Sequence, residues 1–245
     1  MLSACAKDSL LAPVGYPGRL SGSHYVVQKG DTLYSVAFRF GLDYKSLARA
    51  NHIKPPYTIF INQKIRVKGI PPDNGRDSAP DPVVVKPESP SPPSTSVPPR
   101  VVQQSKPVTS SPVYQGKTQL NWIWPVNGQV AKPFSLKGEV NKGIDISGKH
   151  GESVVAAEDG VVVYAGGGLR GYGKLVIVKH NDRYLSAYGN NDSLLVKEGQ
   201  KVKAGERIAR IAQSGNDPAF LHFEIRRDGK PQNPLRLLPK GGSKH

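Results

Sequence analysis

Three short stretches of this chain contain the residues best suited to chemistry: residues 141–145, 188–190 and 220–224. In the last of them apolar and polar residues alternate, which is typical of a half-buried strand. The alternation predicts that Leu221 and Phe223 face a core. Phe220, His222 and Glu224 then lie on the opposite face, where they can present a catalytic surface.

These stretches resemble the zinc-binding motifs of peptidase family M23 (LytM type), whose members cleave peptidoglycan peptides. In that family a His and an Asp of an H-x-x-x-D stretch hold zinc together with the second His of an H-x-H strand. The first His of H-x-H and the His of a Y-x-H motif position the water and the developing oxyanion. Asp145 and His222 match two of the zinc ligands. The other three positions are substituted and carry Asn141, Asn190 and Phe220.

The substitutions predict a hydrolase fold without hydrolysis. A catalytic zinc normally has three protein ligands and one open position for water. Asp145 and His222 supply only two, and the amide of Asn141 is a poor substitute for an imidazole. Phe220 cannot transfer a proton, and Asn190 does not titrate near neutral pH. We therefore expect no metal, no cofactor and no catalytic residue in this part of the chain.

The region that must position these residues is 120–240, which is rich in short apolar runs separated by glycines. Frequent alternation of strand and turn, with few helical periods, predicts an all-β sandwich or open barrel. The resemblance to the M23 (lysostaphin-like) fold covers nearly all of this region, including Asp159-Gly160 and the closing Asn233-Pro234-Leu235. Residues 241–245 are a short tail.

A second folded unit is predicted at residues 24–68 with the order βααβ. A β-prone run is followed by a turn at Gly30, and Asp31 or Thr32 is suited to cap a first helix. Gly41 ends that helix, and a second helix and a closing strand of alternating apolar residues follow.

This unit resembles a LysM repeat over its whole length, beginning with the pattern Y-x-V-x-x-G-D-T-L at Tyr25. LysM modules bind N-acetylglucosamine-containing glycans in a shallow groove between the first strand–helix loop and the second helix–strand loop. The resemblance implies that glycan strands of peptidoglycan contact Gly30, Asp31, Thr32, Leu33, Ile53 and Tyr57. Leu33 and Ile53 are also candidates for the core.

Residues 69–119 contain 12 of the 22 prolines and many serines. Such a segment cannot bury enough apolar surface to offset its chain entropy, so we expect an extended, disordered linker. At about 3.1 Å per residue it could span roughly 150 Å.

The N-terminal residues 1–23 contain the only cysteine, Cys5, in the sequence Leu-Ser-Ala-Cys. A single cysteine rules out an internal disulfide. The tetrapeptide resembles a bacterial lipobox, which implies lipidation of Cys5, and a stray cysteine is the alternative. Ala6 after the cysteine favours, by analogy with Gram-negative lipoproteins, the outer membrane.

The formal net charge is +15, and both folded units are basic, with +6 for residues 24–68 and +7 for residues 120–245. A basic surface suits an anionic partner such as peptidoglycan, phospholipid head groups or nucleic acid. Nucleic acid is the weakest of these because the chain has no motif of a known nucleic-acid-binding fold. The chain contains no run of about 18 or more apolar residues that could span a membrane as a helix.

The order of lipobox, LysM, linker and degenerate LytM domain resembles the NlpD-type lipoproteins, with further likeness in residues 141–146, 169–173 and 233–236. These proteins activate N-acetylmuramoyl-L-alanine amidases during daughter-cell separation. The resemblance implies three partners, namely peptidoglycan glycan strands, a periplasmic amidase and outer-membrane lipid. It also implies a location at the outer membrane, facing the periplasm of a Gram-negative bacterium.

By the same resemblance, the empty cleft receives a regulatory helix of the amidase. Aromatic residues offer apolar area there, amide and imidazole groups offer hydrogen bonds, and Lys142, Arg170 and Arg226 can pair with acidic residues of the helix. A solvated basic face is the alternative for these three cations. The predicted partner-binding residues are Asn141, Lys142, Asp145, Arg170, Tyr172, Tyr188, Asn190, Phe220, His222 and Arg226.

Two other functions compete with an amidase activator. An active zinc endopeptidase would need a third ligand that the motifs do not provide, although His180 could serve. A passive wall-binding lipoprotein would need only the LysM module and would leave the cleft unused.

Overall fold

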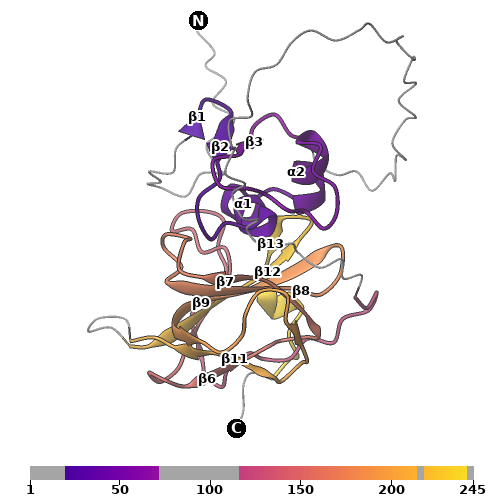
Figure 1. Cartoon of the computed structure of the whole chain (residues 1–245). Coiled ribbons are helices and arrows are strands. Elements are labelled where there is room, and N and C mark those ends of the chain that lie inside the picture. Colours follow the sequence, from indigo (N-terminus) through magenta and orange to yellow (C-terminus); the bar gives the residue numbers. More distant parts are fainter. Residues whose placement is uncertain (1–19, 72–115, 214–217, 242–245) are drawn as a thin grey trace, which may run out of the picture.

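The computed structural model describes residues 20–71, 116–213 and 218–241. The predictions for Cys5 and for most of the linker fall outside these residues. The described residues form a small α+β part followed by a larger, mainly-β part (Figure 1). This confirms the fold class predicted from the sequence.

The small part combines a three-stranded antiparallel sheet, in the order β1-β2-β3, with two helices. The strand β1 precedes the predicted unit, and the closing strand is shorter than the alternation suggested. The elements are β1 (Leu20–Ser21), β2 (His24–Val26), α1 (Leu33–Phe40), α2 (Tyr44–Ala50) and β3 (Lys64–Arg66).

The helix ends follow from local side-chain chemistry. The side chain of Thr32 accepts a hydrogen bond from the backbone N–H of Ser35, and the Ser35 hydroxyl accepts one from Thr32, which completes a capping box. Gly41, at φ 65°, ends α1 in the left-handed conformation that glycine adopts without strain. Asp43 caps α2 by accepting from the N–H of Ser46. The turn between the two helices is therefore fixed by its own residues.

The larger part is built from ten strands and one short 3₁₀ helix. The main path of the sheet runs β10-β7-β8-β9-β12-β5-β4, while β11 pairs with β9 and β6, and β13 pairs with β12. The elements are β4 (Val130–Lys132), β5 (Ile144–Ser147), β6 (Ser153–Val155), β7 (Gly160–Gly166), β8 (Lys174–Lys179), β9 (Tyr184–Leu194), β10 (Lys201–Val202), β11 (Arg207–Ile211), β12 (Phe220–Arg227), β13 (Lys230–Gln232) and η1 (Pro234–Arg236).

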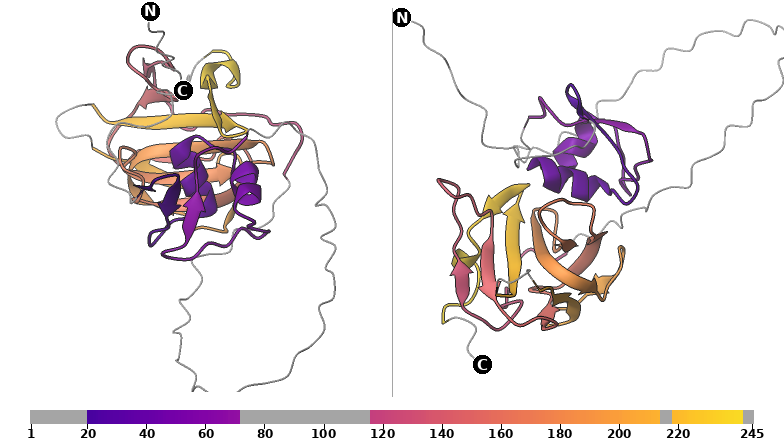
Figure 2. Two further views of the ribbon diagram at one scale, coloured as in Figure 1. Left: turned by 90° about the horizontal axis from the view of Figure 1, so that it is seen from above. Right: turned by 90° about the vertical axis from the view of Figure 1, so that its left-hand side faces the viewer.

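The two faces of the central strands have different neighbours. One face, with Leu221 and Phe223 of β12, packs into the main core of the mainly-β part. The other face carries Ile177 and Ala187, which are fully or almost fully buried in a second apolar cluster shared with the small part. The sheet is thus covered on both faces, and the small part covers the second face (Figure 2).

Helix α1 makes the main contact between the two parts and lies against β7. The Thr32 hydroxyl donates to the carbonyl of Val163 at 3.0 Å. At the other end of α1, the guanidinium of Arg226 donates to the carbonyl of Phe38 at 2.6 Å. Close packing continues at the β12–β13 turn, where a Cβ added to Gly229 would lie 2.3 Å from the Leu42 carbonyl carbon.

Candidate functional site

Strand pairing brings together the two residues that match zinc ligands. In the antiparallel ladder His222 of β12 is opposite Asp145 of β5 on one side and Gly189 of β9 on the other. Directly opposed residues project to the same face of a sheet, so the imidazole and the carboxylate lie side by side. The missing side chain at Gly189 leaves room above the sheet, which the backbone and ring of Tyr172 approach.

Both nitrogens of His222 are engaged by carboxylates. Nδ1 lies 2.7 Å from Oδ1 of Asp145, and Nε2 lies 3.1 Å from Oε1 of Glu224. Burial alone would lower the pKa of His222, but the hydrogen bonds and charges of the two carboxylates outweigh it and raise this pKa to about 9. At neutral pH the ring is therefore an imidazolium that donates from both nitrogens.

Glu224 is the buried centre of this network and was not among the predicted site residues. Burial would raise its pKa, yet Arg226 and His222 hold it well below the usual range. Its Oε2 accepts from Nε of Arg226 at 2.7 Å, and its Oε1 accepts from the hydroxyl of Tyr172 at 2.8 Å. The alternation that placed Glu224 beside His222 was the sequence signal for it.

The network extends into the small part of the chain. The guanidinium of Arg226, 2% exposed, lies 3.4 Å from the centroid of the Phe38 ring. The ring of Phe38 also meets that of Tyr172 edge to face at 5.5 Å, and Tyr172 meets His222 in the same way at 5.6 Å. Arg226 therefore faces helix α1 rather than solvent. Nearby, burial and the positive charge of Arg226 lower the pKa of Lys142.

The substituted positions have structural partners of their own. Asn141 is almost buried, with Nδ2 3.4 Å from the carbonyl of Lys132 and Oδ1 accepting from the N–H of Gly143 at 3.3 Å. Asn190 has φ 62°, a left-handed conformation that asparagine tolerates better than most residues. Its Nδ2 donates to the carbonyl of Phe220 at 2.8 Å. These two amides fix the backbone at the edge of the site.

The donor set differs from that of a catalytic zinc site, which normally has three protein ligands. A ligating imidazole must offer an unprotonated nitrogen, whereas both nitrogens of His222 face carboxylates. Across residues 20–71, 116–213 and 218–241, no group of three or more His, Cys, Asp or Glu side chains is arranged to hold a metal. His222, Asp145 and Glu224 are thus hydrogen-bonded to one another in this structure.

His180 does not supply the missing ligand. Its Nδ1 lies 2.8 Å from the carbonyl of Asp159 and its Nε2 lies 2.6 Å from the Ser186 hydroxyl. Burial lowers the pKa of His180 to about 4. Its ring packs against Trp122 in the main core, on the face of the sheet opposite His222.

Tyr188 is not part of the cleft, contrary to the sequence prediction. It is directly opposite Phe223, and the two rings pack in the main core with centroids 5.3 Å apart. Its hydroxyl accepts from the N–H of Ala157 at 2.8 Å. The reason is the strand alternation itself, because the neighbour Gly189 faces His222 and Tyr188 must then face the core.

The accessible surface around the site lies on two loops. Arg170 is exposed in the loop between β7 and β8, which also carries Tyr172. The backbones of Ser135 and Asn141 exchange two hydrogen bonds, and the loop that they close presents Leu136 and Val140 at 46% and 52% exposure. These two apolar residues were missed by the sequence analysis, although their position next to Asn141 was a usable signal.

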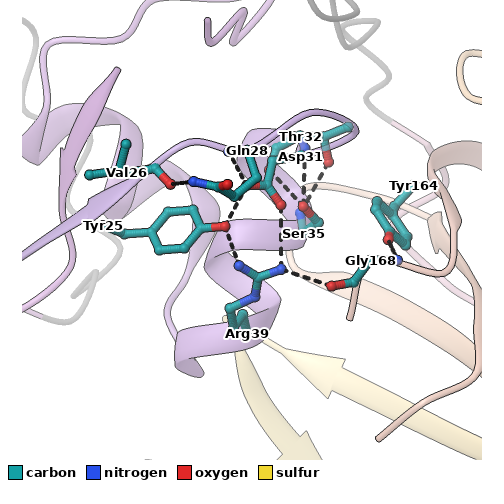
Figure 3. A network of polar contacts seen from close by, with 9 residues as sticks. All are labelled: Tyr25, Val26, Gln28, Asp31, Thr32, Ser35, Arg39, Tyr164 and Gly168. Atoms are coloured by element: carbon teal, nitrogen blue, oxygen red, sulfur yellow. Dashed lines mark hydrogen bonds and ion pairs between the residues drawn. The ribbon is translucent and has the colours of Figure 1, made fainter. Parts of the chain in front are cut away.

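The predicted glycan-binding loop is mostly buried, since Asp31 and Thr32 are 4% and 2% exposed. Asp31 accepts from the hydroxyl of Tyr25 at 2.5 Å and from the N–H of Gln28 at 2.8 Å, and it pairs with Arg39 at 3.4 Å (Figure 3). Burial and the Asp31 carboxylate raise the pKa of Tyr25. This arrangement makes Asp31 a residue that fixes the loop. Leu33 is also fully buried.

The exposed members of the predicted glycan groove are fewer than the sequence suggested. Gly30 is exposed, and Ile53 and Tyr57 are half-buried. Thr32 is buried against β7, as described above. A cavity of about 750 Å³ opens beside Gly30, and its walls come from both parts of the chain. The lining residues are Lys29, Gly30, Tyr164, Ala165, Gly166, Gly167, Gly168, Leu194, Val196, Lys197 and Glu198.

Comparison with known proteins finds two family matches, the LysM domain at residues 25–68 and peptidase family M23 at residues 139–234. The chain is 48% identical to a Pseudomonas aeruginosa protein named lipoprotein NlpD/LppB homolog, over 90% of this chain and 78% of that protein. It is 40% identical to murein hydrolase activator NlpD of Escherichia coli, over 91% of this chain and 69% of that protein. Outer membrane antigenic lipoprotein B of Haemophilus influenzae is 37% identical, over 91% and 65% respectively.

Proposed function

The chain belongs to the NlpD/LppB family of lipoproteins, and on this premise we propose that it is a non-catalytic activator of a murein hydrolase. The hydrolase is a periplasmic N-acetylmuramoyl-L-alanine amidase, and the activity serves septal peptidoglycan splitting and daughter-cell separation. The chain holds itself on peptidoglycan through its LysM module and contacts the amidase through its M23 domain.

The observation that carries the non-catalytic part is the pair of carboxylates around His222. Asp145 and Glu224 take both ring nitrogens, and the imidazolium supplies the positive charge that balances them. Asn141 stands at the third ligand position with its amide held against the backbone of Lys132 and Gly143, so Asp145 and His222 lack the third protein ligand of a catalytic zinc. The M23 fold then offers a binding surface and no hydrolytic centre.

The surface proposed for the amidase is the rim of this network. Leu136 and Val140 offer exposed apolar area on one side, and Arg170 offers a cation on the other. Phe220 and Asn190, both half-buried, add an aromatic ring and an amide that is bonded to the Phe220 carbonyl. A helix with apolar residues on one face and acidic residues on its flank fits this combination.

The LysM module supplies the affinity for the cell wall. Gly30, Ile53 and Tyr57 are the accessible members of its proposed glycan groove. The charge of +6 on residues 24–68 adds attraction to the anionic wall polymer.

The family's names place relatives in the cell envelope of Gram-negative bacteria, as lipoproteins and, in Haemophilus influenzae, as an outer-membrane antigen. We infer the same envelope location here, with acylated Cys5 as the outer-membrane anchor. Within the described ranges, no helix is both long and apolar enough to cross a membrane. In this organisation residues 1–23 tether the chain, 69–119 link the LysM module (24–68) to the M23 domain (120–240), and 241–245 form a tail.

Release of dye from labelled sacculi tests the proposal. The full chain alone should release none, a periplasmic amidase of its host should release some, and the two together should release more. Chelator-sensitive release by the chain alone would identify a zinc endopeptidase. Sacculus binding without any change in amidase activity would identify a passive wall-binding protein.

A further inference from the structure

The LysM module packs on the same face of the sheet that carries the proposed amidase surface. Glu224 of β12 is directly opposite Ala187 of β9, so their side chains share a face. Ala187 is buried in the apolar cluster that includes Tyr34 and Phe38 of helix α1. The LysM module and the His222 network are therefore neighbours on one surface.

Direct contacts join the last turn of α1 to that network. Arg226 stacks on the Phe38 ring and donates to the Phe38 carbonyl. The ring of Tyr172 contacts the ring of Phe38 and also the ring of His222, so only this one ring lies between them. The side chains of His222 and Asp145 are 18% and 16% exposed. A partner helix that reached Arg226 or Glu224 would have to displace Phe38 first.

The contact continues to the edge of the LysM module. Nζ of Lys45 lies 3.1 Å from Oδ2 of Asp182, and the Tyr44 hydroxyl donates to Oδ1 of Asp182 at 3.3 Å. On the opposite edge Arg39 donates to the carbonyl of Gly168 at 3.2 Å (Figure 3). The interface thus extends across both helices and combines apolar contacts with hydrogen bonds and an ion pair.

We propose that this docked arrangement is a closed form of the activator, in which the LysM module covers the part of the amidase-binding face formed by Arg226 and Tyr172 and must leave before the amidase can bind there. The inference rests on the function proposed above and adds its regulation. A module tethered to its own docking surface needs little intrinsic affinity to stay bound, because the effective concentration is of millimolar order. An external ligand can therefore displace it.

The ligand that opens the closed form is the glycan strand itself. The loop from Gly30 to Leu33 lies in the interface, where the Thr32 hydroxyl is bonded to β7. A polymer that engages Thr32 and Leu33 as well, which are 2% and 0% exposed, has to separate Thr32 from Val163. Glycan binding and docking then exclude each other, so the activator opens where it meets peptidoglycan.

Two glycine substitutions give a matched test in the full chain. Gly229 and Gly199 have φ +75° and +84°, and asparagine tolerates this region. A side chain at Gly229 meets the backbone of Leu42, whereas nothing lies within 4 Å of a Cβ at Gly199. Gly229→Asn is therefore a wedge between the two parts, and Gly199→Asn is its control with the same chemistry.

Docking is measured by zero-length carbodiimide coupling of Lys45 to Asp182, mapped by mass spectrometry. We expect coupling in the wild type and in Gly199→Asn, its loss in Gly229→Asn, and a decrease when N-acetylglucosamine hexamer is added to the wild type. If the closed form holds about nine tenths of the molecules, opening lowers the concentration for half-maximal amidase stimulation about tenfold. Should Gly229→Asn not fold, Phe38→Ser repeats the test from the LysM side.

Three results would overturn the inference. Coupling in a folded Gly229→Asn protein equal to that in the wild type would show that the wedge does not open the contact. Loss of coupling with no change in the half-maximal concentration would show that docking does not block the amidase. Coupling that is unaffected by the hexamer would show that glycan binding does not open the closed form. If coupling responds as expected and no amidase is stimulated by any variant, the proposed function fails and the docking equilibrium stands.

Discussion

Asp145 and His222, the two positions at which family M23 places zinc ligands, hold each other through a 2.7 Å contact between Oδ1 and Nδ1. Glu224 occupies the second ring nitrogen, and Arg226 neutralises Glu224. Charge balance that a metal provides in an enzyme is here provided by a proton and a guanidinium. Asp145 and His222 can therefore remain together in this fold without a metal, because their charges are balanced by neighbouring groups.

The first prediction concerns the stability of this network. Glu224→Gln should lower the free energy of unfolding by about 3 kcal/mol, because it leaves two buried cations with a neutral partner. Urea denaturation followed by circular dichroism measures the change. Glu139→Gln is the matched control, since Glu139 is 83% exposed in its pair with Lys132 and should change nothing measurable. Equal stability of Glu224→Gln and wild type would mean that the network is not a buried charge cluster.

The second prediction is a pH dependence carried by His180, whose pKa is lowered by burial to about 4. The unfolded chain takes up the proton near pH 6.5 and the folded chain only near pH 4. The stabilising contribution is therefore complete above pH 6.5 and is lost as the pH falls to about 4, by about 3 kcal/mol. His180→Gln should flatten the unfolding free energy over this range. His150→Gln, at an exposed residue, should follow the wild-type profile.

The third prediction concerns the substituted positions. Restoring Asn141→His, Asn190→His and Phe220→His should give no stoichiometric zinc in metal analysis and no cleavage of sacculi. His222 remains engaged by Asp145 and Glu224 in such a triple variant. Loss of the Phe220 ring should weaken amidase stimulation about thirtyfold, the equivalent of roughly 2 kcal/mol for a buried aromatic anchor. One tightly bound zinc per chain with chelator-sensitive lysis would contradict this.

The fourth prediction concerns the exposed apolar loop beside Asn141. The double variant Leu136→Ser, Val140→Ser should raise the concentration for half-maximal amidase stimulation about tenfold or more, because it removes two exposed apolar contacts. Its folding and its sacculus binding should be unchanged. Leu235→Ser, at a residue 41% exposed on η1, is the control and should stimulate normally. An unaffected double variant would place the amidase elsewhere on the domain.

Parts of this site could be predicted from the sequence because they depend on local periodicity. Alternation in β12 placed Phe223 toward the core and His222 beside Glu224, as the structure shows. Capping signals placed the start and the end of α1. These features follow from the chain within a few residues of each position.

Other parts could not be predicted because they depend on register and on docking. Tyr188 belongs to the core, which becomes clear only when β9 is set opposite β12. The contact of Phe38 with Arg226 joins residues 188 positions apart in the chain. It depends on the shapes of two units that the sequence describes separately, so no motif in either unit signals it.

The central claim is that the M23 domain stimulates a hydrolase without a metal of its own. The most direct measurement uses the full chain after treatment with a chelator that is then removed by dialysis, added to a zinc-loaded amidase on dye-labelled sacculi. We predict that the treated chain alone releases no dye and that it stimulates the amidase as strongly as the untreated chain. Stimulation that is lost on chelation and regained with zinc, or release of dye by the chain alone, would contradict the claim.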